Sequence, residues 1–197
     1  KKLDSLGWGF IDGISSWTWR GYEGKNVTVE VYAPGDEVSL TLNGKEIDRK
    51  PLVDHKAIFE LPYEPGQLQA TSLANGQPGE SFMLRTADQD VQLQAIAERE
   101  TIKASDRDLA YVNIALTDQN GIVNNQADTE IKVEVENGEL LGLGSADPKG
   151  TDSFTADHTH TFNGQALAII RPVKAGRIKV TVSAAGMTAR TVEIATE

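Results

Sequence analysis

The strongest constraint on the fold is an alternation of apolar and polar residues with a period of two. Residues 27–31 alternate valine with polar partners, and the chain turns sharply soon afterwards at Asn43-Gly44. A period of two places successive side chains on opposite faces of a β-strand. Asn-Gly is a strong hairpin signal because both residues tolerate positive φ. This pattern therefore predicts an N-terminal strand, a turn and a tight hairpin over residues 17–47.

The same pattern continues to the C-terminus. Residues 131–135 alternate cleanly, residues 166–170 are nearly all apolar as in a central strand, and Asn137-Gly138 predicts a further turn. Short strands separated by turn signals about every 8–12 residues are typical of β-sandwiches. No stretch shows helical periodicity. We therefore predict an all-β chain with two consecutive immunoglobulin-like β-sandwich domains.

A short polar stretch at residues 86–90 indicates the boundary between the two halves. The first fifteen residues fit neither a helix nor a clean strand, and we expect them to pack on a neighbouring body. Without that body, Trp8 and Phe10 would form an exposed apolar patch. The predicted organisation is a connecting segment at residues 1–15, a first sandwich at 16–88 and a second, C-terminal sandwich at 89–197.

Several motifs carry a resemblance to a known family. In the first half they are residues 16–19, 23–25, 29–32, 42–45, 62–68 and 84–87, and in the second half residues 118–121, 142–148 and 162–166. Their order and spacing resemble the C-terminal, non-catalytic domains of bacterial glycoside hydrolase family 2 enzymes, the β-galactosidase group. Residues Ile47-Asp48 depart from the Leu-Gly that often follows the Asn-Gly-Lys motif in this family.

The resemblance implies an accessory function. The parent enzyme would hydrolyse terminal β-galactosides by a retaining mechanism, using two carboxylates on a catalytic barrel that would also be the main partner of these domains. Homo-oligomerisation of the parent stays open. Tandem spacer domains of a bacterial surface adhesin are an alternative, because they also string immunoglobulin-like domains together.

No catalytic residue is predicted in the chain itself. A glycosidase holds two carboxyl groups across a rigid cleft, and a barrel needs roughly 250 residues of alternating strand and helix. The acidic residues here fall in turns or on the polar side of alternating strands. We therefore expect them to be solvated and none of them to be catalytic.

Trp17 and Trp19 are the candidate carbohydrate-binding residues. On a strand they would share one face, and tryptophans on one face can stack on sugar rings. They can equally be packed in a core, because an indole ring buries a large area while its N–H finds a partner. We favour packing and keep a carbohydrate-binding module as the alternative function.

No metal site or cofactor site is predicted. His158 and His160 lie two residues apart near several aspartates, but the spacing satisfies no zinc or calcium pattern. The glycines at residues 142 and 144 lack the third glycine and the helix of a dinucleotide-binding motif, so they indicate a turn.

The amino-acid composition argues against some classes of binding partner. The 197 residues carry a net charge of −10 and contain no cysteine. The acidic balance offers no basic patch for nucleic acid or an anionic membrane, and no apolar run approaches the ~20 residues of a membrane helix. Cysteine-free chains fit any compartment. For the parent we favour the periplasm or secretion over the cytoplasm.

Overall fold

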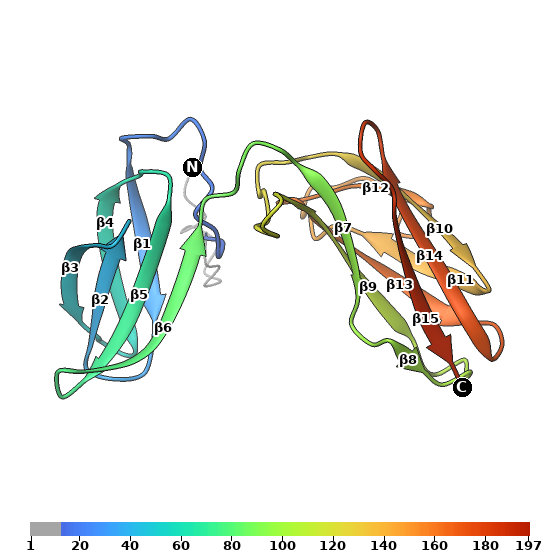
Figure 1. Ribbon diagram of the computed structural model, residues 1–197, viewed down its shortest axis with the longest axis horizontal. Coiled ribbons are helices and arrows are strands. Elements are labelled where there is room, and N and C mark those ends of the chain that lie inside the picture. Colours follow the sequence, from blue (N-terminus) through green and yellow to red (C-terminus); the bar gives the residue numbers. More distant parts are fainter. Residues whose placement is uncertain (1–12) are drawn as a thin grey trace. The chain divides into compact units, whose positions relative to one another are not determined.

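The structure is a computed structural model that describes residues 13–197 (Figure 1). The chain divides into two compact units between Thr86 and Ala87. Residues 1–12, and with them the expectation for Trp8 and Phe10, lie outside the described residues. The predicted domain boundaries stay a prediction.

The first unit consists of two antiparallel sheets of unequal width. A two-stranded sheet pairs β1 with β4, and a four-stranded sheet has the order β3-β2-β5-β6. The strands are β1 (Asn26–Tyr32), β2 (Glu37–Leu42), β3 (Lys45–Pro51), β4 (Lys56–Pro62), β5 (Gln67–Ala74) and β6 (Gln77–Arg85).

The predicted hairpin lies between β2 and β3. Asn43 and Gly44 have φ angles of 53° and 79°, the positive values that a two-residue loop requires. The predicted N-terminal strand is shorter than expected, because β1 begins at Asn26 and the residues before it form turns and irregular structure.

The core of the first unit lies between its two sheets. Val38 and Leu40 of β2 and Phe59 of β4 are almost completely buried. The inward valines of β1 are only half-buried. Because the sheet of β1 and β4 is only two strands wide, these valines lie at the margin of the core.

The second unit contains nine strands in two larger sheets. A five-stranded sheet has the order β12-β10-β14-β15-β8, and a four-stranded sheet has the order β11-β13-β9-β7. The strands are β7 (Gln92–Ala97), β8 (Thr101–Ile102), β9 (Ala110–Thr117), β10 (Glu130–Glu136), β11 (Gly138–Gly144), β12 (His158–His160), β13 (Gln165–Pro172), β14 (Gly176–Ala184) and β15 (Arg190–Thr196).

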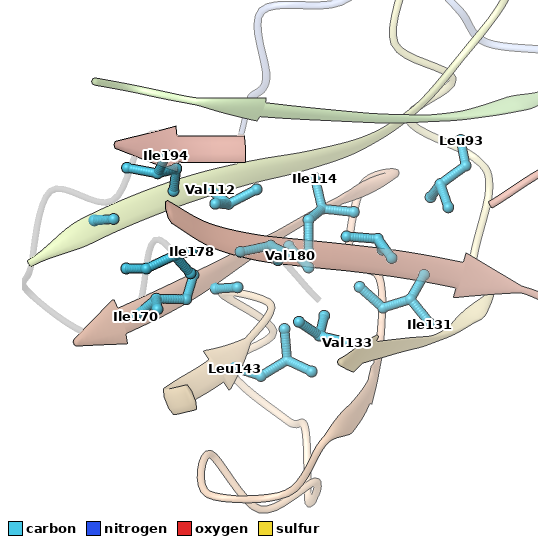
Figure 2. Packing of buried hydrophobic residues seen from close by; sticks show 14 of the residues in the cluster. Leu93, Val112, Ile114, Ile131, Val133, Leu143, Ile170, Ile178, Val180 and Ile194 are labelled. Atoms are coloured by element: carbon cyan, nitrogen blue, oxygen red, sulfur yellow. The ribbon is translucent and has the colours of Figure 1, made fainter. Parts of the chain in front are cut away.

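Aliphatic side chains from both sheets fill the interior of the second unit. Figure 2 shows Val112, Ile114 and Ile170 from the four-stranded sheet meeting Val180 and other branched residues from the five-stranded sheet. The nearly all-apolar run predicted as a central strand is β13, which lies between β11 and β9.

The predicted turn at Asn137-Gly138 is a junction between the two sheets of the second unit. Asn137 has a φ angle of 60°, and the chain leaves β10 in one sheet and enters β11 in the other. A Cβ atom on Gly138 would lie 3.0 Å from the side chains of Ile170 and Ile178, which belong to opposite sheets. The junction therefore passes through the margin of the core, where a larger residue would force these side chains to shift.

The fold class is confirmed. Both units are all-β, and each has two sheets packed face to face. Within residues 13–197 no helix is long and apolar enough to cross a membrane.

Candidate functional site

Trp17 belongs to a hydrogen-bonded cluster at one end of the first unit. The Trp17 ring is 2% exposed, packs edge-on against the Tyr63 ring with centroids 5.1 Å apart, and donates its Nε1–H to the Glu64 carbonyl at 3.0 Å. Neither face of the ring is available to a ligand in this arrangement.

Trp19 is half-buried and is held by the same cluster. Its backbone N–H donates to the Tyr63 hydroxyl at 3.1 Å, and its indole N–H donates to the Ser16 carbonyl at 3.2 Å. The Thr86 hydroxyl donates to the Trp17 carbonyl at 2.6 Å. These side-chain bonds replace a strand ladder, so residues 17–19 form no strand, and the two rings do not share a strand face. Packing of Trp17 and Trp19 stays the favoured interpretation, and carbohydrate binding by them stays the alternative.

The two histidines on β12 are each paired with a different carboxylate. His158 Nδ1 lies 3.0 Å from Asp157, and this hydrogen bond raises the pKa of His158 above its ordinary value. His160 Nδ1 lies 3.2 Å from Asp152. The structure brings no third ligand to either pair, and within residues 13–197 no three histidine or acidic side chains gather as a metal site.

Asp118 is the one acidic side chain that is buried among the described residues. One carboxylate oxygen accepts the backbone N–H of Asp88 at 2.9 Å. The other accepts the N–H groups of Asn120 at 2.8 Å and Ile122 at 2.9 Å. Burial alone would raise the pKa of Asp118, but these hydrogen bonds outweigh burial and hold it below its ordinary value.

The perturbed carboxyl groups have the opposite pKa shift from that of a glycosidase acid. A general acid for glycoside cleavage needs a raised pKa. Every perturbed carboxyl among residues 13–197 has a lowered pKa, because each accepts hydrogen bonds in its ionised form. They are Glu30, Glu46, Asp108, Asp118, Asp152 and Asp157.

A surface cavity of about 160 Å³ lies in the first unit, between the end of β1 and the strands β5 and β6. Its lining includes Tyr32 and Phe82, with small apolar side chains such as Ala70 and with the carboxyl-bearing Glu80. Tyr32 is 56% exposed and Phe82 is 65% exposed. This pair of exposed aromatic residues was not singled out by the sequence, because only the unequal widths of the two sheets leave Phe82 uncovered.

Comparison with known proteins identifies the family. Residues 93–193 match the model for the glycoside hydrolase family 2 C-terminal domain 5. The chain belongs to this family. Residues 24–79 match a second model, described as a domain of unknown function. The resemblance found in the sequence motifs is thereby confirmed.

The relatives of this glycoside hydrolase family 2 chain are longer proteins. A β-galactosidase of Bacteroides ovatus is 25% identical over 170 residues, which cover 84% of this chain and 20% of the relative. The crystal structure of a glycosyl hydrolase family 2 member from Bacteroides cellulosilyticus is 30% identical with a TM-score of 0.89, and the match covers 95% of this chain and 25% of that one.

A third relative supports the fold alone. The crystal structure of a β-glycosidase from Bacteroides vulgatus is 24% identical with a TM-score of 0.85, over 92% of this chain and 24% of that one. The chain thus spans about a fifth to a quarter of the length of these relatives. Its match to a C-terminal domain family agrees with the predicted accessory region.

Proposed function

We propose that this chain is the C-terminal, non-catalytic region of a β-galactosidase-like glycoside hydrolase, in which it covers and supports a catalytic barrel. The observation that carries the proposal is the match of 84% of the chain to one fifth of a β-galactosidase. The lowered carboxyl pKa values support the non-catalytic part of the proposal, because a retaining glycosidase needs one carboxyl group that stays protonated near neutral pH.

The proposed work of the two units is mechanical. Each unit has its own apolar core, and a rigid body packed on a barrel holds loops around the active site in position. We therefore expect the barrel to be the main partner of this chain. The retaining mechanism and the preference for terminal β-galactosides belong to the parent enzyme.

Two measurements test the proposal. The purified chain should release no nitrophenol from 4-nitrophenyl β-galactoside, whereas the complete product of the gene should hydrolyse it and release the β-anomer of galactose first. Deleting residues 87–197 from the complete product should lower its melting temperature. The anomer that is released first should stay the same. Turnover by the chain alone that disappears on replacing one of its own carboxyl groups would contradict the proposal, as would a complete product that cleaves no β-galactoside.

A further inference from the structure

The cavity beside Phe82 exists because the two sheets of the first unit differ in width. Phe82 pairs with Ala70, and Leu84 pairs with Leu68, so Phe82 lies on the face of β6 that points toward the opposite sheet. Leu68 is buried at 4% exposure, yet Phe82 is 65% exposed. The opposite sheet ends at β1 and leaves the Phe82 ring uncovered.

The cavity has the size of a single six-membered ring. An engineered protein cavity of about 150 Å³ holds one benzene molecule, and the volume here is about 160 Å³. Ala33 and Pro34 of the turn that follows β1 also line it. Val31 and Ala70 are small apolar members of the lining, so the exposed ring of Phe82 has room beside it.

Tyr32 is fixed in place before any ligand binds. Its hydroxyl donates to a Glu30 oxygen at 2.7 Å, and the Lys56 ammonium lies 5.4 Å from the centre of its ring. Lys56 and Glu30 form an ion pair at 2.7 Å. These contacts lie on the outer face of β1, the face turned away from the core, so Tyr32 borders the cavity through its backbone.

The backbone of Tyr32 adds a hydrogen-bond donor and acceptor on the same side. In the β1–β4 ladder the N–H of Ala33 bonds to β4 at His55, and antiparallel strands alternate between residues that face the partner and residues that face away. The N–H and C=O of Tyr32 therefore point to the free edge of β1. No strand pairs with that edge among the described residues.

Glu80 supplies the remaining polar group. It lines the cavity, is exposed, and forms no ion pair with any residue of the described range. Its carboxylate accepts hydrogen bonds from hydroxyl groups and repels anions. A cavity with one exposed aromatic ring, a carboxylate and a backbone donor–acceptor pair matches a neutral sugar, which has an apolar C–H face and a rim of hydroxyl groups.

We propose that the cavity between β1 and β6 binds one neutral hexose residue of a glycan, with the Phe82 ring contacting the sugar ring, the Tyr32 backbone bonding to its rim and Glu80 accepting from its hydroxyls. A terminal β-galactosyl residue is the first choice, and that choice rests on the proposed function. A β-strand added along β1 is the competing occupant, but the cavity is lined by only the last two residues of β1 and by the turn that follows it.

The test is a titration of the whole chain followed by ¹⁵N–¹H NMR. Methyl β-galactoside and, separately, methyl β-glucoside are added up to about 100 mM. We expect saturable shifts at the amides of Tyr32 and Phe82 with a dissociation constant of about 1–30 mM, because one sugar ring with few contacts binds weakly. Phe82→Ala should weaken binding at least tenfold, and Glu80→Gln should weaken it several-fold.

Two matched variants distinguish binding at this site from non-specific binding to exposed aromatic side chains. Tyr32→Phe keeps the ring and the backbone groups, so it should change the affinity less than twofold. Phe154→Ala removes another exposed aromatic side chain, 71% exposed in the second unit, and should leave binding unchanged. Both variants should keep the amide spectrum of the folded chain.

Several results would overturn the proposal. They are the absence of saturable shifts at Tyr32 and Phe82, a folded Phe82→Ala variant with unchanged affinity, and equal loss of binding in Phe154→Ala. Shifts at the Thr28 and Glu30 amides that grow with protein concentration alone would assign the edge of β1 to strand pairing instead. Binding of the glucoside without the galactoside would refute the galactosyl choice, and none of these readouts depends on hydrolysis by the parent.

Discussion

Replacing Asp118 by asparagine tests whether the buried carboxylate stabilises the second unit. Three backbone N–H groups donate to its two oxygens at 2.8–2.9 Å. An asparagine side chain has one acceptor oxygen and one NH₂ group, so it can satisfy two donors and must face the third with a donor of its own. A hydrogen bond to a charged group contributes about 1.5–3 kcal/mol. We expect Asp118→Asn to lower the free energy of unfolding by about 2–3 kcal/mol at pH 7.

Urea unfolding followed by two probes locates the effect. All three tryptophans precede residue 20, so tryptophan fluorescence reports on the first unit, and far-ultraviolet circular dichroism reports on both. We expect Asp118→Asn to move the unfolding of the second unit to lower urea concentration. This change should be visible in the dichroism signal and absent from the fluorescence signal. Asp106→Asn, a change at an exposed loop position, should stay within about 0.5 kcal/mol of the parent chain. A loss below 0.5 kcal/mol in Asp118→Asn would refute the reasoning.

The pH dependence gives a second check on the same carboxylate. The folded pKa of Asp118 lies below its ordinary value, so the folded state binds this proton less readily than the unfolded state. Its stabilising contribution is complete above the unfolded pKa of about 3.9 and is lost as the pH falls through the folded value. The difference in stability between the parent chain and Asp118→Asn should therefore shrink below about pH 4.

Three further predictions follow from single contacts. Tyr63→Phe should lower the free energy of unfolding of the first unit by about 1–3 kcal/mol in a urea titration, because the buried N–H of Trp19 loses its acceptor. Gly164→Ala should destabilise the second unit by more than about 2 kcal/mol, because its φ is +71° and the new Cβ would meet the Asn124 carbonyl oxygen. Asp157→Asn should lower the pKa of His158 in a proton NMR titration, because it removes the main cause of the raised value.

Matched variants sharpen these three measurements. Gly186→Ala also changes a glycine with φ of +74°, but no atom lies within 4 Å of the new Cβ, so it should cost about 1 kcal/mol. Equal losses at Gly164 and Gly186 would contradict the steric argument. Tyr22→Phe, at a residue that is 49% exposed, should leave stability unchanged. A His158 pKa that does not move in Asp157→Asn would contradict the assigned pairing.

Local chemistry made the strands and the tight hairpins predictable. The alternation in β1 and β10 and the positive φ of Asn43 and Gly44 follow from nearest neighbours in the sequence. The irregular segment around Trp17 was not predictable in this way, because its backbone is held by Tyr63, a residue 46 positions away. Long-range hydrogen bonds leave no periodic signal in the sequence.

The candidate cavity shows the same limit. Phe82 is two residues from Leu84 and therefore lies on the same, inward face of β6. Its exposure depends on how many strands the opposite sheet contains. Alternation in the sequence predicts which face of the sheet a side chain lies on. It does not predict how many strands the opposite sheet contains. The burial of Trp17 shows the same limit, since its ring packs against Tyr63, which follows β4 and lies far away in the sequence.

The junction at Asn137 and Gly138 restricts how the length of this chain can change during evolution. A single inserted residue there would reverse the inward and outward phase of all of β11 relative to β10, turning Leu143 out of the core. Insertions in the exposed loop at residues 145–157 leave both sheets in phase. Related chains are therefore expected to vary in length in that loop and to keep the spacing between Val135 and Leu143 constant.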